Sequence, residues 1–316
     1  MGEYTMDIIC VGEMLIDFLP GDEAGAFIRK AGGAPANVAV AAARNGLQVG
    51  FCGTMGNDDF GKFLAGTLEE NGVNYLCPQL LDEAVTTMAF VSLDATGNRS
   101  FTFARKPGAD MLMTKEHVDE ALKNNPVVVH AGSVSMSAEP AATSTVYAME
   151  KNHEAGRLVS FDLNYRNLLW NDDRAACSAA VQKILPLVDF LKISDEEEDM
   201  LGMAPEEAAK HYGIAALVET LGGDGARCWW NGKMLSVPGR KAKCVDTTGA
   251  GDSFWGGFLS CLLRAGVRSA ADLTEELIVR ALNYGNVAGW LCVQKKGAME
   301  SLPTTAEIEA ILAAEA

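Results

Sequence analysis

A glycine-rich turn beside a single carboxylate is the strongest chemical feature of this sequence. Residues 246–254 read Asp-Thr-Thr-Gly-Ala-Gly-Asp-Ser-Phe, and apolar residues at helical spacing follow them. Free backbone N–H groups at the start of such a helix form an anion site, and glycine lets a phosphate approach the backbone closely. A carboxylate beside that site is unfavourable unless it has a chemical role. We expect Asp252 to accept a proton from an attacking hydroxyl, while Gly249, Ala250 and Gly251 hold the phosphoryl oxygens.

Part of this pattern has a simpler structural explanation. Gly-x-Gly at a helix start is often only a tight turn, and aspartate in the first turn often only complements the helix dipole. The nine-residue string is far more specific than Gly-x-Gly alone. It closely resembles the C-terminal signature of the PfkB, or ribokinase-like, family of carbohydrate kinases. The resemblance extends from the first predicted strand to residue 303, so it covers almost the whole chain.

Composition and charge limit the classes of ligand. The chain has 316 residues, enough for one large α/β domain, and a net charge of −16. Nucleic acid and anionic membranes need a basic face, so we expect neither as a partner. A nucleotide site must therefore take its positive potential from backbone amides, a few cationic side chains and a metal ion. The sequence shows no signal peptide, membrane-length apolar run or paired cysteine motif, which predicts a cytoplasmic protein.

Short apolar strands alternate with longer helical patterns along the chain. This alternation predicts an α/β fold with a mostly parallel sheet covered on both faces, and ligands bind such folds at the carboxyl ends of the strands. The family resemblance implies one ribokinase-like, three-layer α/β/α domain over residues 1–316. The predicted strands are residues 7–12, 48–54, 127–131, 158–162, 190–194, 216–220 and 226–230. The predicted helices are residues 36–45, 61–71, 138–155, 173–185, 196–201, 205–212, 252–265 and 275–293.

Two segments interrupt this alternation. Residues 14–29 and 86–105 lack helical periodicity, and the second alternates apolar and polar residues on both sides of residues 94–98, as a β-hairpin does. We expect a small β lid, spanning about residues 13–33 and 85–107, rather than ordinary edge strands. A lid has free strand edges, and pairing two lids would bury them, so we also expect a homodimer formed through the lid.

Two early polar blocks are candidates for sugar binding. Asp17 follows the first predicted strand, and the turn at residues 32–37, Gly-Gly-Ala-Pro-Ala-Asn, opens a helix rich in small residues. By themselves these are a loop aspartate and a tightly packed turn. The family resemblance implies that Asp17, Gly33 and Asn37 bind the sugar. An asparagine side chain suits a hydroxyl because it offers both a donor and an acceptor.

Two later polar blocks are similar to the fructokinase branch of the family. Residues 103–110 read Phe-Ala-Arg-Lys-Pro-Gly-Ala-Asp, and residues 162–170 contain Asp-x-Asn-x-Arg followed by a tryptophan. The alternatives are a solvated basic turn and a structural Arg–Asp ion pair. The resemblance implies that the polar side chains of these blocks bind substrate or lie between the sugar and the phosphates. These residues are Arg105, Asp162, Asn164 and Arg166.

The resemblance assigns the last third of the chain to ATP and metal ions. It implies that Glu197 holds the shell of Mg²⁺ through water, although the usual asparagine three residues earlier is Ser194 here. Asp246 and Thr248 match positions that bind a monovalent cation such as K⁺ in several relatives. The implied nucleotide neighbours are Thr220, Gly222, Gly225, Asn286 and Gly297.

The resemblance to this family, and to its fructokinase branch, implies an ATP-dependent sugar kinase that phosphorylates the primary hydroxyl of D-fructose to give fructose 6-phosphate. 2-Keto-3-deoxygluconate, ribose and aminoimidazole riboside remain alternative acceptors, because the motifs are shared across the family. A ketodeoxy acid would need a further cation for its carboxylate, and Arg29, Lys30, Arg99 or Lys106 could supply one. Outside the kinases, a non-catalytic sugar-binding or nucleotide-binding protein is the alternative, and the intact Asp252 and glycine turn argue against it.

Overall fold

The computed structural model describes residues 4–21, 23, 25–93 and 99–315, and its larger sheet has nine strands. These are β1 (Met6–Val11), β4 (Val49–Cys52), β5 (Val73–Tyr75), β8 (Pro126–Gly132), β9 (Leu158–Asp162), β10 (Phe190–Ser194), β11 (Ala216–Thr220), β12 (Gly225–Trp230) and β13 (Lys233–Pro238). Their order across the sheet is β13-β12-β11-β10-β9-β8-β1-β4-β5. Neighbours from β11 to β5 are parallel, and β12 and β13 form an antiparallel edge.

All the predicted strands lie in this sheet, with small changes at their ends. β5 and β13 are additional to the prediction. β5 has three residues, too few to show a period of two, and β13 carries exposed polar residues and ends in a proline at the sheet edge.

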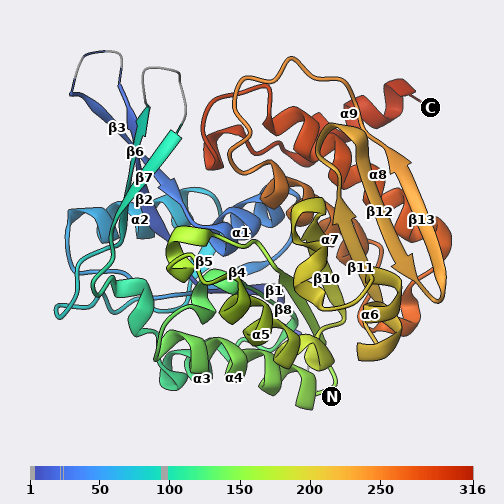
Figure 1. Ribbon diagram of the computed structural model, residues 1–316, viewed down its shortest axis with the longest axis horizontal. Coiled ribbons are helices and arrows are strands. Elements are labelled where there is room, and N and C mark those ends of the chain that lie inside the picture. Colours follow the sequence, from blue (N-terminus) through green and yellow to red (C-terminus); the bar gives the residue numbers. More distant parts are fainter. Residues whose placement is uncertain (1–3, 22, 24, 94–98, 316) are drawn as a thin grey trace.

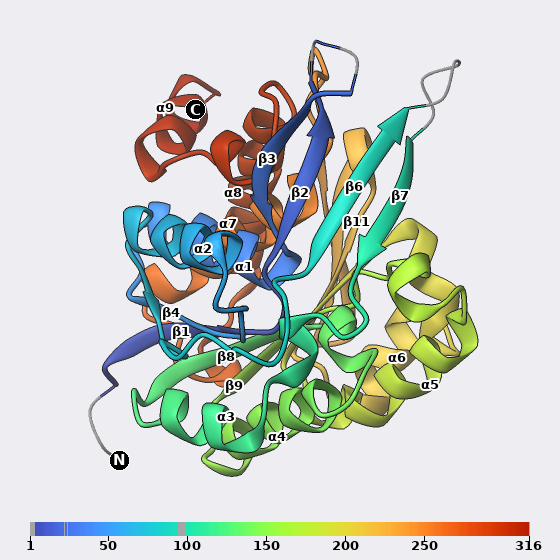
Figure 2. The same ribbon diagram turned by 90° about the vertical axis from the view of Figure 1, so that its left-hand side faces the viewer.

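Helices cover both faces of the large sheet (Figures 1 and 2). Ile8 and Ile9 of β1 belong to separate hydrophobic clusters, one on each face. The first face is covered by α1 (Ala34–Arg44), α2 (Asp59–Glu70), α7 (Ala250–Arg264), α8 (Glu275–Cys292) and α9 (Thr305–Glu315). The second face is covered by α3 (Lys115–Leu122), α4 (Ala141–Glu154), α5 (Arg174–Ile184) and α6 (Pro205–Tyr212). This arrangement confirms the predicted three-layer α/β/α fold.

The helices differ from the prediction in a few places. α3 and α9 are additional, and α3 is short, with only two buried apolar residues. The segment predicted as a helix at residues 196–201 is a 3₁₀ helix, Asp195–Leu201, whose first turn is entirely acidic and which ends at Gly202 in the left-handed conformation. Among the described residues, no helix combines the length and apolar character needed to cross a membrane.

A second, smaller sheet of four strands stands away from the large one (Figure 2). Its strands are β2 (Leu15–Pro20), β3 (Phe27–Gly32), β6 (Met88–Leu93) and β7 (Arg99–Ala104), in the order β3-β2-β6-β7. We refer to these four strands as the lid. The predicted hairpin turn at residues 94–98 lies outside the described residues, and the strands that flank it pair antiparallel as predicted. Phe18 of the lid packs against Phe90 and against Phe60 of α2, with ring centroids 4.9 and 5.5 Å apart.

Candidate active site

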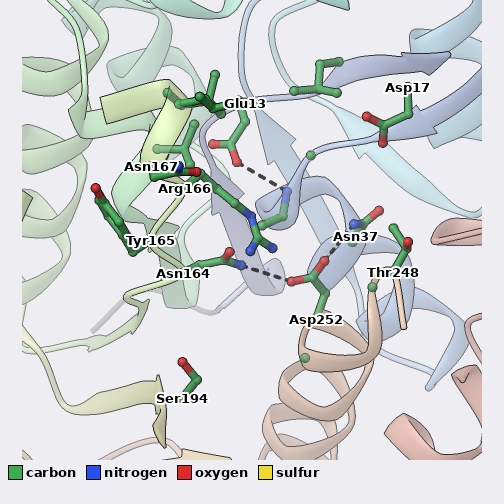
Figure 3. Close-up of a pocket in the computed structure, with 18 of the residues that line it drawn as sticks. Glu13, Asp17, Asn37, Asn164, Tyr165, Arg166, Asn167, Ser194, Thr248 and Asp252 are labelled. Carbon is green, nitrogen blue, oxygen red and sulfur yellow. Dashed lines mark hydrogen bonds between the residues drawn. The ribbon is translucent and has the colours of Figure 1, made fainter. Parts of the chain in front are cut away.

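A cavity of about 560 Å³ lies between the lid and the carboxyl ends of the parallel strands (Figure 3). β1 and β8 are neighbours in the large sheet, and the strand order proceeds in opposite directions from them. α/β folds bind ligands at such a point. The lining residues come from both ends of the chain and from the lid. They include Asp17, Asn37, Phe103, Asn164, Arg166, Lys192, Glu197, Thr220, Gly249, Gly251 and Asp252.

The glycine turn before α7 forms one wall of this cavity. Gly249 adopts a left-handed conformation, with φ of 77°, and the helix begins at Ala250. Gly249 and Gly251 line the cavity, whereas the N–H of Ala250 donates to the carbonyl oxygen of Thr247 at 3.2 Å. Two of the three predicted phosphate-binding positions therefore face the cavity, at the positive end of the dipole of a 15-residue helix.

Asp252 lies in the first turn of α7 and is 5% exposed. Its Oδ2 accepts a hydrogen bond of 2.7 Å from Asn37 Nδ2, and its Oδ1 accepts one of 3.3 Å from Asn164 Nδ2. Burial raises the pKa of this carboxyl, and the negative charge of Asp162 adds to the effect, while the Asn37 hydrogen bond opposes it. Two amide donors thus orient a carboxylate whose proton affinity is higher than usual, as a general base requires.

Asp17 and Gly33 lie at the base of the lid and line the cavity. Burial raises the pKa of Asp17 to about 6, and the Arg166 guanidinium opposes this shift. A Cβ at position 32 would lie 2.2 Å from Asp17 Oδ2, so only glycine leaves room there for the carboxylate. Gly33 has φ of 111°, and a Cβ would lie 2.5 Å from the carbonyl oxygen of Glu13. Both glycines allow the backbone to pack tightly where β3 meets α1.

Arg105 has partners outside the cavity. Its Nε and Nη2 donate to Asp110 Oδ2 at 2.9 and 2.7 Å, and its Nη1 donates to Ser137 Oγ at 3.1 Å. Arg105 is not among the residues that line the cavity. In this structure it ties the end of the lid to the main body, and substrate binding by Arg105 stays a prediction.

The Asp-x-Asn-x-Arg block divides into two parts. Asn164 and Arg166 line the cavity and point towards Asp252 (Figure 3). Asp162 does not line the cavity, and it pairs with Lys192, which does. Asn164 has a positive φ of 42°, so the chain turns sharply between the two parts. This conformation costs free energy and directs the amide to the base.

Glu197 links the end of β10 to this block. Its Oε2 accepts from the N–H of Ser194 at 2.8 Å, and its Oε1 accepts from the N–H of Tyr165 at 2.6 Å. Glu197 is 7% exposed and lines the cavity. Each carboxylate oxygen keeps a second lone pair, so the side chain can still accept a hydrogen bond from water.

The residues predicted to lie near ATP are divided between the cavity and its surroundings. Thr220 lines the cavity at the end of β11. Asn286 of α8 donates to the carbonyl oxygen of Pro238 at 3.2 Å. Gly297 donates its N–H to Asp246 Oδ2 at 3.1 Å. The other four residues, Gly222, Gly225, Asn286 and Gly297, do not line the cavity. The nucleotide roles of all five residues stay predictions.

Asp246 connects two loops beside the glycine turn. Its Oδ1 accepts from the N–H and the Oγ1 of Thr248 at 3.0 and 2.7 Å, and its Oδ2 accepts from Gly297. Asp246 is 8% exposed, and Thr248 lines the cavity. The arrangement fixes the loop before α7 to the loop after α8, which orders the anion turn between them.

A model described as pfkB family carbohydrate kinase matches residues 5–305. The chain belongs to the PfkB family of carbohydrate kinases. Fructokinase-2 of Oryza sativa subsp. japonica is 37% identical over 317 residues, which cover 96% of this chain and 93% of the relative. Among solved structures, a fructokinase from Xylella fastidiosa with bound ATP is 33% identical, with a TM-score of 0.87 and coverage of 98% and 99% of the two chains. A double-mutant fructokinase from Vibrio cholerae O395, bound to fructose, ADP and potassium, is 33% identical, with a TM-score of 0.82 and coverage of 99% and 100%.

The cavity of this kinase is also lined by two ionisable residues that were not predicted as site residues from the sequence, Glu13 and Lys192. Glu13 is 3% exposed and joins β1 to the lid. Its Oε1 accepts from the N–H of Ala34 at 3.3 Å, and its buried Oε2 has no hydrogen-bond partner among the described residues. Burial raises the pKa of this carboxyl to about 8; the charge of Asp110 adds to this and that of Arg105 opposes it. At neutral pH the folded kinase therefore holds a proton on Glu13.

Glu13→Gln is expected to change how the stability of the kinase depends on pH. The folded state binds the Glu13 proton more tightly than the unfolded state, so its stabilising effect is complete below the usual carboxyl pKa and is lost as pH rises through about 8. Gln keeps the shape and the acceptor for Ala34 but cannot ionise. Urea unfolding should show the variant gaining roughly 3 kcal/mol relative to wild type between pH 5 and 8.5. Parallel pH curves for the two proteins would contradict this, and Glu69→Gln, an exposed change on α2, is the control.

Proposed function

We propose that this kinase transfers the γ-phosphoryl group of ATP to the 6-hydroxyl of D-fructose, giving fructose 6-phosphate and ADP. The observation that supports this most directly is the position of Asp252, a buried carboxylate held by two amides beside the glycine turn. The rice relative is named a fructokinase, and the Vibrio cholerae relative binds fructose and ADP. Asp17, Gly33 and Asn37 would bind the sugar on the lid side, and the turn would bind the phosphates.

The proposed chemistry is an in-line displacement at the γ-phosphorus. The hydroxyl oxygen of fructose forms a bond to phosphorus while the bond from phosphorus to the bridging oxygen of ADP breaks, and ADP leaves with that electron pair. Asp252 accepts the hydroxyl proton. The backbone N–H groups of the turn and the guanidinium of Arg166 stabilise the negative charge on the phosphoryl oxygens.

We also propose that Mg²⁺ enters with the nucleotide and that K⁺ binds beside the turn. Among the described residues, no group of three or more His, Cys, Asp or Glu side chains is placed to hold a metal ion. Mg²⁺ would therefore be held chiefly by phosphate oxygens and water, with Glu197 contacting that water, and it would neutralise charge on the β- and γ-phosphates when bound. Asp246 and Thr248 are the residues we propose for K⁺, a cation present in the Vibrio cholerae relative.

Three of the four basic residues considered for a carboxylate-bearing acceptor such as 2-keto-3-deoxygluconate give it little support, and the side chain of the fourth, Arg99, lies outside the part that the structure describes. Arg29 lies over the ring of Phe63, 3.8 Å from its centroid, and Lys30 pairs with Glu300 at 2.7 Å. Lys106 is exposed and does not line the cavity. Fructose, which is uncharged, needs no further cation.

ADP release from Mg-ATP should be measured with fructose, ribose, 2-keto-3-deoxygluconate and aminoimidazole riboside, in K⁺ and in choline buffers. We expect selective turnover of fructose and faster turnover in K⁺. Selective turnover of another acceptor would refute the fructose assignment and leave the kinase chemistry in place. No turnover of any acceptor, despite nucleotide binding, would favour a non-catalytic protein.

We further propose a cytoplasmic homodimer that forms through the lid. Phe27 and Ile28 lie on β3, an edge strand of the lid, and are 47% and 48% exposed. Pairing two lids would cover both these side chains and the free strand edge. Sedimentation velocity of wild type and Ile28→Glu tests the interface, and a monomeric wild type at micromolar concentration would refute it. All eight cysteines are free thiols, which suits a reducing compartment.

A further inference from the structure

Lys192 is a buried cation on the floor of the cavity. It lies in the middle of β10, between apolar residues, and is 5% exposed. Its Nζ donates to both Asp162 Oδ1 and Asp162 Oδ2 at 2.9 Å. Taking an ammonium group out of water costs several kcal/mol, and a pair of two charged groups seldom repays this cost by stability alone. A lysine at the centre of a sheet therefore suggests a chemical role.

The ammonium group lies directly beside the phosphate-binding turn. Lys192 Nζ is 3.3 Å from the position that a Cβ would take on Gly251, one residue before Asp252. An ammonium has three N–H donors, and Asp162 accepts two of them. No described residue accepts the third, and Lys192 is among the residues that line the cavity.

The charges around the cavity require such a cation. The described lining of the cavity contains the carboxylates of Asp17, Glu197 and Asp252, beside the protonated Glu13, and its cations are Arg166 and Lys192. Burial lowers the pKa of Lys192, but Asp162, Glu197 and Asp252 raise it above its usual value, so the side chain stays charged at neutral pH. ATP adds several negative charges to this acidic surface, and a buried cation acts strongly because no water screens it.

We propose that Lys192 is a catalytic residue of the phosphoryl transfer, which donates its third N–H to an oxygen of the transferring phosphoryl group. Asp162 is then a positioning residue that fixes the ammonium below the turn, rather than a ligand of the sugar. This assignment rests on the ATP-dependent transfer proposed above and adds a second cation to Arg166. It also explains why Gly251 has no side chain, since a Cβ there would crowd Lys192.

Nucleotide probes of different length test this role. In Lys192→Gln, we expect the affinity for ADP with beryllium fluoride, which mimics the γ-phosphoryl group, to fall at least tenfold. Adenosine affinity should stay within about twofold, and kcat with fructose should fall by ~10²-fold. A purely structural lysine would change the affinities for both probes equally, and that result would overturn the proposal, as would a kcat within threefold of wild type.

Two further variants keep the test decisive. If Lys192→Gln does not fold, the double variant Lys192→Gln/Asp162→Asn removes both charges together. The ratio of its affinity for ADP with beryllium fluoride to its affinity for adenosine is then measured. Arg227→Gln is the matched control, because Arg227 pairs with the buried Glu219 and does not line the cavity. The control should leave the ratio unchanged. Wild type that binds ADP with beryllium fluoride but does not phosphorylate fructose would refute the proposed substrate, while the affinity ratio would still decide the role of Lys192.

Discussion

Asp252→Asn is expected to lower kcat by ~10³-fold while the fold and the sugar affinity stay close to wild type. Asn has the size of Asp and keeps one oxygen that can accept from the amide of Asn37 or Asn164. It cannot accept the proton of the sugar hydroxyl, so the attacking oxygen stays weakly nucleophilic. Since Asp252 is buried, water cannot easily replace the missing base.

Steady-state kinetics with fructose and Mg-ATP, together with calorimetric titration of fructose, measure this effect. Asp119→Asn on α3 is the control, because that carboxylate is exposed, accepts a hydrogen bond from Tyr147 and does not line the cavity. We expect the control to keep full activity. A near-wild-type rate for Asp252→Asn would mean that another group accepts the proton.

Local patterns were enough to predict most of the fold. The strands are short apolar runs between turns, and parallel neighbours place their carboxyl ends at one edge of the sheet. This geometry alone brings Asn164, Ser194 and Thr220 to the same edge, although they are far apart in the sequence. The glycine turn at 249–251 could also be predicted, because all of its features lie within a few consecutive residues.

Partners that are distant in sequence could not be predicted. Asn37 and Asp252 are 215 positions apart, and their hydrogen bond depends on how α1 packs against α7. Lys192 interrupts an apolar strand, and without the register of β9 and β10 nothing showed that Asp162 is its neighbour. The family resemblance assigned Arg105 to the substrate, and the sequence did not show that its partners would be Asp110 and Ser137. Its role in substrate binding stays a prediction.

Asn37→Asp is expected to show how strongly residue 37 affects the pKa of Asp252, the proposed base. The new carboxylate would lie where Nδ2 now donates to Asp252 Oδ2 at 2.7 Å, and two carboxylates at that distance share one proton. The pKa of Asp252, already raised by burial, would rise further. A larger share of Asp252 would then carry a proton at neutral pH, so kcat should fall by ~10²-fold. Activity should return as pH rises, because the reaction needs Asp252 without its proton.

Asn37→Ala separates the charge from the loss of the donor. Both variants lose the hydrogen bond to Asp252 and the contact that we propose between Asn37 and the sugar, so both should raise the KM for fructose. Only Asn37→Asp adds a negative charge, and we expect the acid limb of its pH–rate profile to lie at higher pH than that of Asn37→Ala. Coincident acid limbs would mean that Asp252 is not the titrating base. An acid limb displaced towards higher pH, with kcat recovering above it, would identify the carboxylate held by Asn37 as the group that accepts the proton.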